Sequence, residues 1–316
     1  MPAAAPILTL TLNPALDLST SAAQVRPGEK LRCAEPTANA GGGGLNVARA
    51  LHRLGAPSVA LVALGGLTGD RLADLLRAEG IAFLALKSPG ETRQSMTVTE
   101  ETTGAQYRFL LPGPHWSVAD QRQVFALLAA TARAGSIAVI SGSQPPGVPR
   151  DFAAQLAASM PESRVVLDTS GTALVQAVSH PIPGLEVLRM DGEEAEGLAG
   201  RSLASRAETA DFAQELVRRG VARMVVVARG ADGNVLADAE RRLFAKAPKV
   251  TLKSAVGAGD SFVAAFVLGL ARGEGPGRAL AFGSASAAAA VITDATQLCR
   301  AEDVLRLLPQ AEVSEV

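Results

Sequence analysis

Short apolar segments alternate with longer amphipathic segments over most of the 316-residue chain. The apolar segments predict buried strands, and the amphipathic segments predict helices that cover them. We expect strands at residues 7–12, 59–63, 81–86, 137–141, 165–168, 186–189 and 224–228, and a closing hairpin at 235–236 and 242–244. We expect helices at residues 45–54, 69–78, 258–271, 276–293 and 302–308. This alternation is typical of an α/β fold with a doubly wound, mostly parallel sheet that is flanked by helices.

Two separated segments show a different pattern. Residues 95–99 and 106–110 alternate between polar and apolar with a period of two, and a Thr-Gly turn joins them, which predicts a hairpin. Residues 17–36 are polar and irregular, with short strand-like pieces around 30–33. We interpret residues 13–38 and 92–111 as one small antiparallel sheet, a β lid. The lid would be inserted twice into a core made of residues 1–12, 39–91 and 112–316.

The composition narrows the classes of partner and compartment. The formal net charge is −1 and no block of like charge stands out, so we expect neither nucleic acid nor a membrane as partner. No apolar segment is long enough to span a bilayer, and the first residues lack the positively charged region of a signal peptide. Two cysteines, Cys33 and Cys299, are too few for a disulfide framework. We therefore expect a cytoplasmic protein.

The first candidate site is Gly257-Ala258-Gly259-Asp260, which precedes a long segment of small and apolar residues. Glycines at the start of a helix let backbone N–H groups point together at an anion, and the helix dipole adds to this attraction. An aspartate in that first turn can take a proton from a nearby hydroxyl. Phosphoryl transfer needs both features. The alternative is that Asp260 is only a favourable acid in the first turn of a helix.

The second candidate site is the run of glycines from Gly41 to Gly44, followed by Leu45 and Asn46. A dinucleotide-binding motif would require an acidic residue at the end of the next strand, and none is there. A P-loop would require a following Gly-Lys-Ser/Thr, which is also absent. The run could let a small polar ligand approach the backbone, with Asn46 supplying a directed amide. It could equally be a flexible turn.

The two motifs together resemble the paired signatures of the ribokinase-like (PfkB-type) carbohydrate kinases, and the resemblance covers nearly the whole chain. Other segments that carry it are 11–17 (TLNPALD) and 141–147 (SGSQPPG). The segments 30–33 (KLRC), 92–94 (TRQ) and 106–109 (QYRF) resemble the branch that acts on sugar phosphates. In kinases of fructose 1-phosphate and tagatose 6-phosphate a lysine usually interrupts the glycine run. Gly43 therefore favours fructose 6-phosphate as the substrate.

The resemblance implies ATP-dependent phosphorylation of this sugar at its C1 hydroxyl. It implies Asp260 as the catalytic base and the helix start at Gly257, Ala258 and Gly259 as the anion hole. The implied sugar-binding residues are Asp17, Gly42, Gly43, Asn46 and Ser143, with Lys30, Arg32 and Arg93 on the existing phosphate. The implied ATP-binding residues are Arg189, Asp191, Ala228, Gly230, Gly233 and Val256, and Glu194 would hold Mg²⁺ through water. A homodimer through the lid is also implied, in which a basic residue of one subunit reaches the other's substrate.

The chain departs from the family pattern at three places. Residues 189–194 read RMDGEE where relatives usually carry Lys-Pro-Asn-x-x-Glu, and Asp191 with Glu194 could instead form a capping box. Ala228 stands where relatives usually offer a hydroxyl to ATP, a loss that costs about 0.5–1.5 kcal/mol of binding free energy. Residues 293–296 (TDAT) replace a usual Gln-Gly-Thr, so the sequence does not decide whether a monovalent cation binds there.

Other interpretations of these residues and of the function stay open at this point. Arg93 could be a solvated strand side chain, and Ser143 could be a turn residue before Pro-Pro. The substrate could be tagatose 6-phosphate or fructose 1-phosphate. The departures at Arg189, Asp191 and Ala228 also allow a catalytically weak sugar-phosphate sensor on the same fold.

Overall fold

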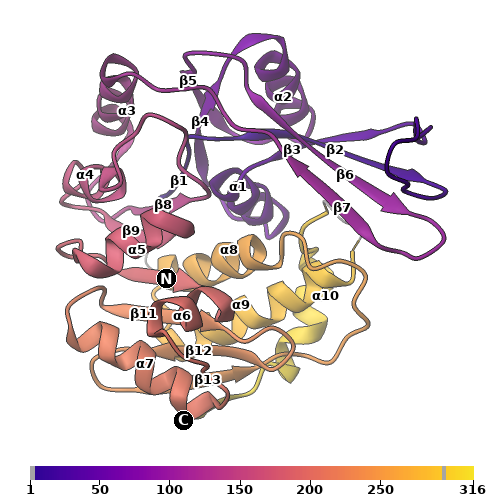
Figure 1. The fold of residues 1–316 in the computed structure, drawn as a ribbon. Helices are drawn as coiled ribbons and strands as arrows, with labels where there is room; N and C mark the ends of the chain where they lie inside the picture. The colour runs from indigo at the N-terminus through magenta and orange to yellow at the C-terminus, as the bar shows by residue number, and fades with distance from the viewer. Residues whose placement is uncertain (1–3, 294–296) are drawn as a thin grey trace.

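A ten-stranded sheet forms the centre of the protein in the computed structural model, which describes residues 4–293 and 297–316 (Figure 1). Its strand order is β14-β13-β12-β11-β10-β9-β8-β1-β4-β5. The parallel strands are β1 (Ile7–Thr11), β4 (Val59–Leu64), β5 (Phe83–Lys87), β8 (Ile137–Ser141), β9 (Arg164–Asp168), β10 (Val187–Met190) and β11 (Met224–Ala228). The antiparallel edge strands are β12 (Gly233–Ala237), β13 (Arg242–Lys246) and β14 (Val313–Glu315). The predicted α/β fold with a mostly parallel sheet is confirmed.

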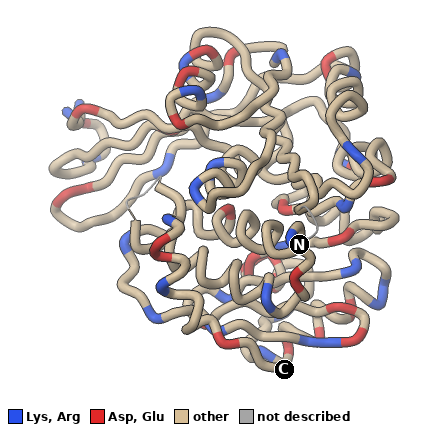
Figure 2. Tube along the Cα trace, turned by 180° about the vertical axis from the view of Figure 1, so that it is seen from behind, with Lys and Arg blue, Asp and Glu red and all other residues tan. Residues whose placement is uncertain are grey.

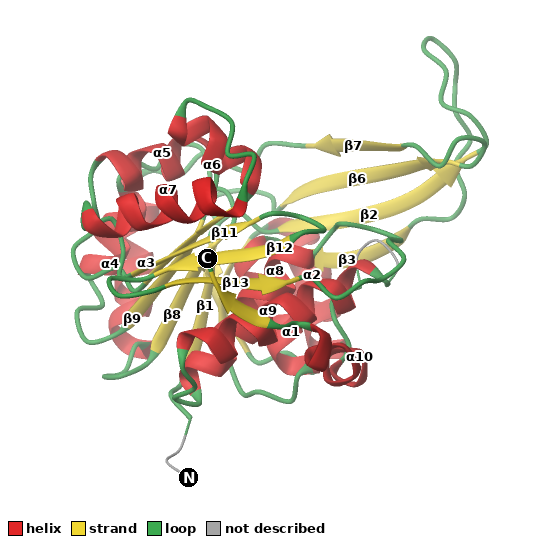
Figure 3. Ribbon diagram, turned by 90° about the horizontal axis from the view of Figure 1, so that it is seen from below, coloured by secondary structure: helices red, strands yellow, loops and turns green. Residues whose placement is uncertain are grey.

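Helices cover both faces of this sheet (Figure 3). One face packs against α1 (Gly43–Arg53), α2 (Gly66–Ala78), α8 (Ala258–Ala271), α9 (Pro276–Val291) and α10 (Ala301–Leu307), which a short 3₁₀ turn (Leu308–Gln310) follows. The other face packs against α3 (Val118–Thr131), α4 (Phe152–Ala158), α5 (Gly171–Ser179), α6 (Gly192–Ala199) and α7 (Arg206–Arg218). Neighbouring residues of a strand serve opposite faces: Val187 belongs to the first core and Leu188 to the second. The strands are therefore apolar at nearly every position, as the sequence indicated.

Small residues let α8 approach its neighbours closely, which explains a core with few aromatic side chains. A methyl group on Gly269 of α8 would lie 3.0 Å from Cα and Cβ of Ala279 in α9. A methyl group on Gly283 of α9 would lie 2.7 Å from the ring of Phe262. These distances leave no room for larger side chains, so the alanine- and glycine-rich composition fixes α8, and with it the residues at its start.

The small sheet has the order β3-β2-β6-β7 and consists of β2 (Ala15–Ala22), β3 (Thr37–Gly41), β6 (Arg93–Glu100) and β7 (Gln106–Leu110). It projects from the core (Figure 3). The predicted hairpin is confirmed as β6 and β7. The prediction of a purely antiparallel sheet is wrong, because the central pair β2–β6 is parallel. The strand-like pieces expected around 30–33 are also wrong, because residues 23–36 form a loop between β2 and β3.

The register of the small sheet gives it a polar face and an apolar face. Asp17 pairs with Ser95, and two residues further along β6 Thr97 pairs with Arg108, so these side chains share one face. Leu18, Met96 and Phe109 occupy successive paired positions on the opposite face, where Met96 and Phe109 are exposed. The polar face is the one on which the predicted sugar-binding residue Asp17 lies. Whether the lid and the core are separate domains with the predicted boundaries stays a prediction.

The charged residues and the character of the helices bear on possible partners of the protein. Lysine and arginine alternate with aspartate and glutamate along the trace without a large segment of one sign (Figure 2). Among the residues that the structure describes, no helix combines the length and the apolar character that crossing a membrane would require.

Candidate active site

Several of the predicted site residues lie at the carboxyl ends of the parallel strands, where open α/β sheets bind ligands. Ser143 follows β8, and Asp168, which the sequence analysis did not assign, ends β9. Arg189 lies near the end of β10, and Ala228 ends β11. Asp260 faces this edge from the first turn of α8. Residues that are far apart in the sequence therefore meet because their strands are parallel and adjacent.

Asp260 is held by the second glycine motif. Its Oδ2 accepts a hydrogen bond of 2.9 Å from Nδ2 of Asn46 in α1. Gly257, directly before α8, adopts a left-handed conformation with φ of 77°, which glycine tolerates at no steric cost. The two glycine-led helices that the sequence singled out therefore start side by side, and one amide joins them.

Burial raises the pKa of Asp260 to about 7, and the negative charge of Asp168 adds to the increase. The hydrogen bond from Asn46 and the positive charge of Arg189 oppose this shift. A carboxylate with a pKa near the working pH combines a large ionised fraction with a strong affinity for a proton. The environment of Asp260 thus suits a general base better than it suits a solvated helix-capping acid.

Arg49 fixes Asn46, a role that the sequence analysis did not assign. Its guanidinium makes two 2.7 Å hydrogen bonds to the carboxylate of Glu79, and Nη1 also donates to the carbonyl of Ala40 at 2.7 Å and to Oδ1 of Asn46 at 3.4 Å. Only 2% of the side chain is exposed. A hydrogen bond to Oδ1 leaves the Nδ2 group of Asn46 to face Asp260. The one available signal was an arginine three residues after Asn46, on the same face of the helix.

The glycine run leaves room for polar groups at the sugar side. A methyl group on Gly41 would collide with the carboxylate of Asp17, and one on Gly43 would lie 2.7 Å from the backbone nitrogen of Gly142. Gly42 has a φ of 119°, which disfavours any residue with a side chain. The run is therefore a close backbone approach rather than a flexible turn. A side chain at position 43 would have to displace Gly142.

Three further residues that were predicted for the sugar side lie near this run: Asp17, Ser143 and Arg93. Oδ1 of Asp17 accepts a short hydrogen bond from the hydroxyl of Ser95, and burial raises the pKa of Asp17. Nδ2 of Asn13 donates to Oγ of Ser143 at 3.1 Å, and Nε of Arg93 donates to the carbonyl of Asn13 at 3.2 Å. Arg93 is half-buried at the near end of β6, so it is more than a solvated strand side chain.

Lys30 and Arg32 lie elsewhere. Both are exposed in the loop 23–36 at the far end of the small sheet. Arg93 pairs with Ala15 at the near end, and the eight-residue strand β2 separates the two ends by roughly 25 Å. Within one chain the structure therefore does not bring the three predicted phosphate-binding residues together.

On the nucleotide side, Arg189 reaches the start of α8. Its Nη1 donates to Oδ1 of Asp168 at 3.2 Å, and Oδ2 of the same carboxylate accepts from the hydroxyl of Ser141 at 3.0 Å. The guanidinium lies against Gly259, where an added methyl group would be 3.0 Å from Nη2. Nε of Arg189 is buried and has no hydrogen-bond partner among the described residues. An anion at the start of α8 could accept from it.

Asp191 and Glu194 form a capping box, the alternative that the sequence left open. Oδ1 of Asp191 accepts from the backbone N–H of Glu194, and Oε2 of Glu194 accepts from the backbone N–H of Asp191, both at 2.9 Å. Burial raises the pKa of Glu194. Its Oε1 has no such role in the cap, and a carboxylate oxygen suits the water shell of Mg²⁺. The described residues contain no ready cluster of three or more metal-ligating side chains, so a magnesium ion here would need oxygen atoms from a bound nucleotide.

The loop from Ala228 to Gly233 turns β11 back into β12. Gly230 has a φ of 56° and Gly233 a φ of 141°, and a methyl group on Gly233 would collide with the carbonyl of Ala245. Val256 is half-buried just before α8, and its N–H donates to the hydroxyl of Ser254 at 3.2 Å. The sequence segment 293–296 bears on whether the chain binds a monovalent cation, and three of its residues, 294–296, lie outside the described residues.

Known proteins resemble this chain over nearly its full length. The family described as "pfkB family carbohydrate kinase" matches residues 11–303. The ATP-dependent 6-phosphofructokinase isozyme 2 of Mycobacterium tuberculosis (strain ATCC 25618 / H37Rv) is 41% identical over 313 residues, which cover 98% of this chain and 91% of that protein. The isozyme 2 of Escherichia coli (strain K12) is 38% identical over 303 residues, or 95% and 97% of the two chains.

Solved structures agree with the sequence relatives. The crystal structure of Escherichia coli phosphofructokinase-2 with fructose-6-phosphate matches with a TM-score of 0.90 at 35% identity, over 97% of this chain and 99% of that chain. The Escherichia coli protein has also been solved with potassium, with substrates and products, and in a tetrameric inhibited form.

Proposed function

This chain belongs to the PfkB family of carbohydrate kinases, and on that premise we propose that it transfers a phosphoryl group from ATP to the C1 hydroxyl of fructose 6-phosphate. It is a sugar kinase of the 6-phosphofructokinase isozyme 2 type. The observation that carries the proposal is the buried carboxylate of Asp260, which Asn46 orients at the start of the glycine-led helix α8. A base and a set of anion-binding N–H groups then occupy one helix turn.

In the proposed reaction Asp260 accepts the proton of the C1 hydroxyl while that oxygen attacks the γ-phosphorus of ATP. The bond from the γ-phosphorus to the β,γ-bridging oxygen breaks, and ADP leaves with the electron pair. The backbone N–H groups of Ala258, Gly259 and Asp260 stabilise the charge on the moving phosphoryl group. The guanidinium of Arg189, which lies against Gly259, adds a positive charge, and Asp168 keeps this side chain in place.

The remaining nucleotide contacts come from three loops. Gly230 and Gly233 let the backbone approach the phosphates of ATP, Asp191 faces the same edge of the sheet, and Val256 lines the adenine side. When bound, Mg²⁺ would neutralise charge on the β- and γ-phosphates. Glu194 would orient that ion through its water shell. A potassium ion is found in a structure of the Escherichia coli relative, and we propose the same type of monovalent cation for this chain.

The choice of sugar rests on the packing around Gly43. No side chain fits there while Gly142 keeps its position, so this arrangement excludes the lysine that kinases of fructose 1-phosphate and tagatose 6-phosphate usually carry. Asp17, Gly42, Asn46 and Ser143 would then bind the sugar hydroxyls. Fructose 6-phosphate is also the ligand in a structure of the Escherichia coli relative.

We propose that the lid completes the phosphate site through a second copy of the chain. Arg93 would bind the 6-phosphate in its own subunit. Lys30 and Arg32 lie too far from Arg93 along the lid to join it in one chain. In a homodimer whose lids clasp, the loop 23–36 of the partner could reach this phosphate.

The test is the substitution Asp260→Asn, which keeps the shape of the side chain and the contact with Asn46 but removes the base. We expect kcat to fall by about 10²–10⁴-fold while KM for both substrates changes little. ADP release is measured with fructose 6-phosphate, tagatose 6-phosphate and fructose 1-phosphate as acceptors. The matched control is Asp211→Asn. Asp211 lies on α7, away from the site, and forms an exposed ion pair with Arg242 of β13.

Near-wild-type turnover of Asp260→Asn would remove Asp260 from the mechanism. If the wild-type protein turns over none of the three sugars, the sensor interpretation replaces the kinase.

The raised pKa of Asp260 gives the pH dependence of the same step. Only the ionised carboxylate accepts a proton, so kcat/KM, which reports the ionisation of the free enzyme, should fall about tenfold per pH unit below pH 7 and level off above it. The folded pKa lies above that of the unfolded chain, so the cost of ionising Asp260 builds up between about pH 4 and pH 7. Asp260→Asn should therefore raise the melting temperature more at pH 8 than at pH 4. An equal change at both pH values would contradict the buried carboxylate.

A further inference from the structure

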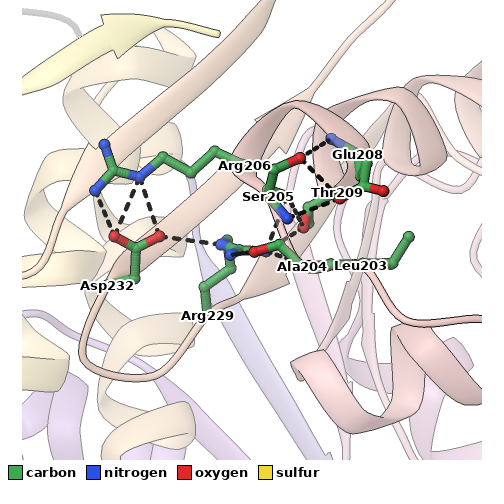
Figure 4. Close-up of polar contacts among 8 residues, drawn as sticks. All are labelled: Leu203, Ala204, Ser205, Arg206, Glu208, Thr209, Arg229 and Asp232. Atoms are coloured by element: carbon green, nitrogen blue, oxygen red, sulfur yellow. Dashed lines mark hydrogen bonds and ion pairs between the residues drawn. The ribbon is translucent and has the colours of Figure 1, made fainter.

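The loop that turns back after β11 is anchored by one side chain, Arg229 (Figure 4). Its Nη1 donates to the carbonyls of Leu203 at 2.9 Å and Ser205 at 3.2 Å, and forms a short hydrogen bond with the hydroxyl of Thr209. Its Nη2 donates to the carbonyl of Ala204 at 2.9 Å. Only 16% of the side chain is exposed. The guanidinium thus fastens the loop to the chain just before and within the first turn of α7.

A second arginine holds the other end of the loop. Nε of Arg206 donates to both carboxylate oxygens of Asp232, at 3.1 and 3.0 Å, and Nε of Arg229 donates to the same carboxylate at 3.1 Å. The guanidinium of Arg206 stacks on the ring of Phe244 in β13, 3.9 Å from its centre. The hydrogen bonds from Arg206 lower the pKa of Asp232, so the carboxylate stays charged.

The backbone of the loop closes on itself as well. The N–H of Arg229 donates to the carbonyl of Gly233 at 2.8 Å, and the N–H of Asp232 donates to the carbonyl of Arg229 at 3.2 Å. The turn is thereby fixed at Arg229, at Asp232 and at Gly233. Only Gly230 and Ala231, between them, take no part in these contacts, and both are at the surface.

We propose that Arg229 is a positioning residue for the nucleotide, which holds the loop 228–233 in its ATP-binding shape before ATP arrives. This inference rests on the proposed function, because the contact of the loop with the phosphates is part of that function. Arg229 itself points away from the site, toward α7, and acts through the backbone of its loop.

The physical reason is the entropy of ordering. A free loop would lose conformational freedom when ATP binds, and that loss would weaken binding. A loop that is already fixed avoids it. This advantage matters in this chain because Ala228 offers no hydroxyl to ATP. The planar fork of arginine suits several carbonyl oxygens at once, and the single ammonium of lysine does not.

The test compares the affinity of the free protein for the non-hydrolysable analogue AMP-PNP with Mg²⁺, measured by titration calorimetry. Arg229→Met should weaken this affinity about three- to tenfold, and Arg229→Lys should recover little of it. Asp232→Asn should have a smaller effect, about twofold, because Arg229 keeps its contacts with residues 203–209. The affinity for fructose 6-phosphate should stay unchanged, and in kinetics KM for ATP should rise while kcat is kept.

The matched control is Arg164→Met. Arg164 also forms an ion pair, with Glu186, and a hydrogen bond to a backbone carbonyl, that of Leu270. It lies at the start of β9, at the end of the strand that faces away from the site. Its loss should lower the melting temperature without changing the affinity for AMP-PNP. Hydrogen exchange gives a second readout: amides 229–233 should exchange faster in free Arg229→Met than in the free wild type.

An unchanged AMP-PNP affinity in folded Arg229→Met would overturn the inference, and so would an equal loss of affinity for fructose 6-phosphate. If Arg229→Met does not fold, Asp232→Asn decides, and an unchanged affinity there overturns it. If the protein binds AMP-PNP as expected but phosphorylates no sugar phosphate, the proposed function fails while the role of Arg229 stands.

Discussion

The two halves of the proposed site differ in how much of each a single chain completes. In the core half, side chains near the proposed point of phosphoryl transfer are fixed by others of the same chain: Asn46 holds Asp260, and Ser141 with Asp168 holds Arg189. In the lid half, Arg93 donates to the backbone carbonyl of Asn13, but Lys30 and Arg32 lie exposed at the far end of the small sheet. In the proposed site, one chain therefore completes the catalytic half, whereas the phosphate half would need a second copy.

Packing explains this difference. The strands of the core are buried on both faces, and α8 is buried between α1 and α9, so the residues at its start have little freedom. The apolar face of the small sheet is only partly covered: Leu16 and Val98 are buried, but Met96 and Phe109 remain exposed. Its edge strand β7 is exposed at every residue. An uncovered apolar face beside a free edge strand is typical of a surface that pairs with another chain.

A charge on the apolar face of the lid should separate the properties of the two halves most strongly. Phe109→Asp would bury an unpaired carboxylate between two lids, so we expect the dimer to separate. The loss of Lys30 and Arg32 of the second copy should then lower kcat/KM for fructose 6-phosphate by at least about 100-fold. Sedimentation velocity gives the mass of the particle and an ADP-release assay gives the rate. The affinity for AMP-PNP should not change, because the core half is complete in one chain.

Leu305→Asp is the matched control, since Leu305 is 67% exposed on α10, away from the lid. It should leave both mass and rate unchanged. A fully active monomer of Phe109→Asp would show that one chain completes the phosphate site by itself.

Mixing two inactive variants should show whether the lid loop of one subunit serves the active site of the other. Asp260→Asn keeps the lid loop but lacks the base, whereas the double substitution Lys30→Ala and Arg32→Ala keeps the base but lacks the loop cations. A heterodimer would combine the base of one subunit with the loop of the other in one of its two sites. Equal mixing with random exchange should therefore restore about a quarter of the wild-type activity. No recovery after verified subunit exchange would mean that each chain uses its own loop.

The sequence predicted the core half far better than the lid half. The helix 258–271 and the strands at 137–141 and 224–228 have the predicted bounds, because a buried parallel strand and a helix in the core are apolar throughout. The strand β2 was missed, because a half-exposed strand of sequence ALDLSTSA resembles an irregular polar segment. The parallel pairing of β2 with β6 joins residues that are 78 positions apart in the sequence, such as Ala15 and Arg93, which no local pattern contains.

The same division holds for the site. Asp260 and Asn46 could be proposed from the sequence because each sits in a glycine motif with its own chemical signature. Arg49 was not assigned, because its role depends on Glu79, which α2 brings to it. The capping box of Asp191 and Glu194 could be predicted as an alternative, since its spacing is local. The network of Arg229 could not, because it joins residues 203–209 to the loop after β11.

The smallest expected effect concerns the core half alone. Ala228→Ser would offer the ATP phosphates the hydroxyl that relatives supply, and one neutral hydrogen bond should tighten AMP-PNP binding about three- to tenfold. The affinity for fructose 6-phosphate should stay the same, because the lid is not involved. Ala239→Ser is the matched control, since Ala239 is exposed in the turn after β12. An unchanged AMP-PNP affinity in Ala228→Ser would place the nucleotide away from this residue.

The added hydroxyl also reports on the loop that carries it. It can meet a phosphate only if the loop already has its binding shape, so the gain should depend on Arg229. In the double variant Ala228→Ser with Arg229→Met, we expect the gain to shrink to about twofold or less, which a double-mutant cycle measures as a coupling. Combined instead with Phe109→Asp, the same gain should persist in full. Coupling to Arg229 without coupling to the lid would mean that the core half binds its nucleotide independently of the second chain.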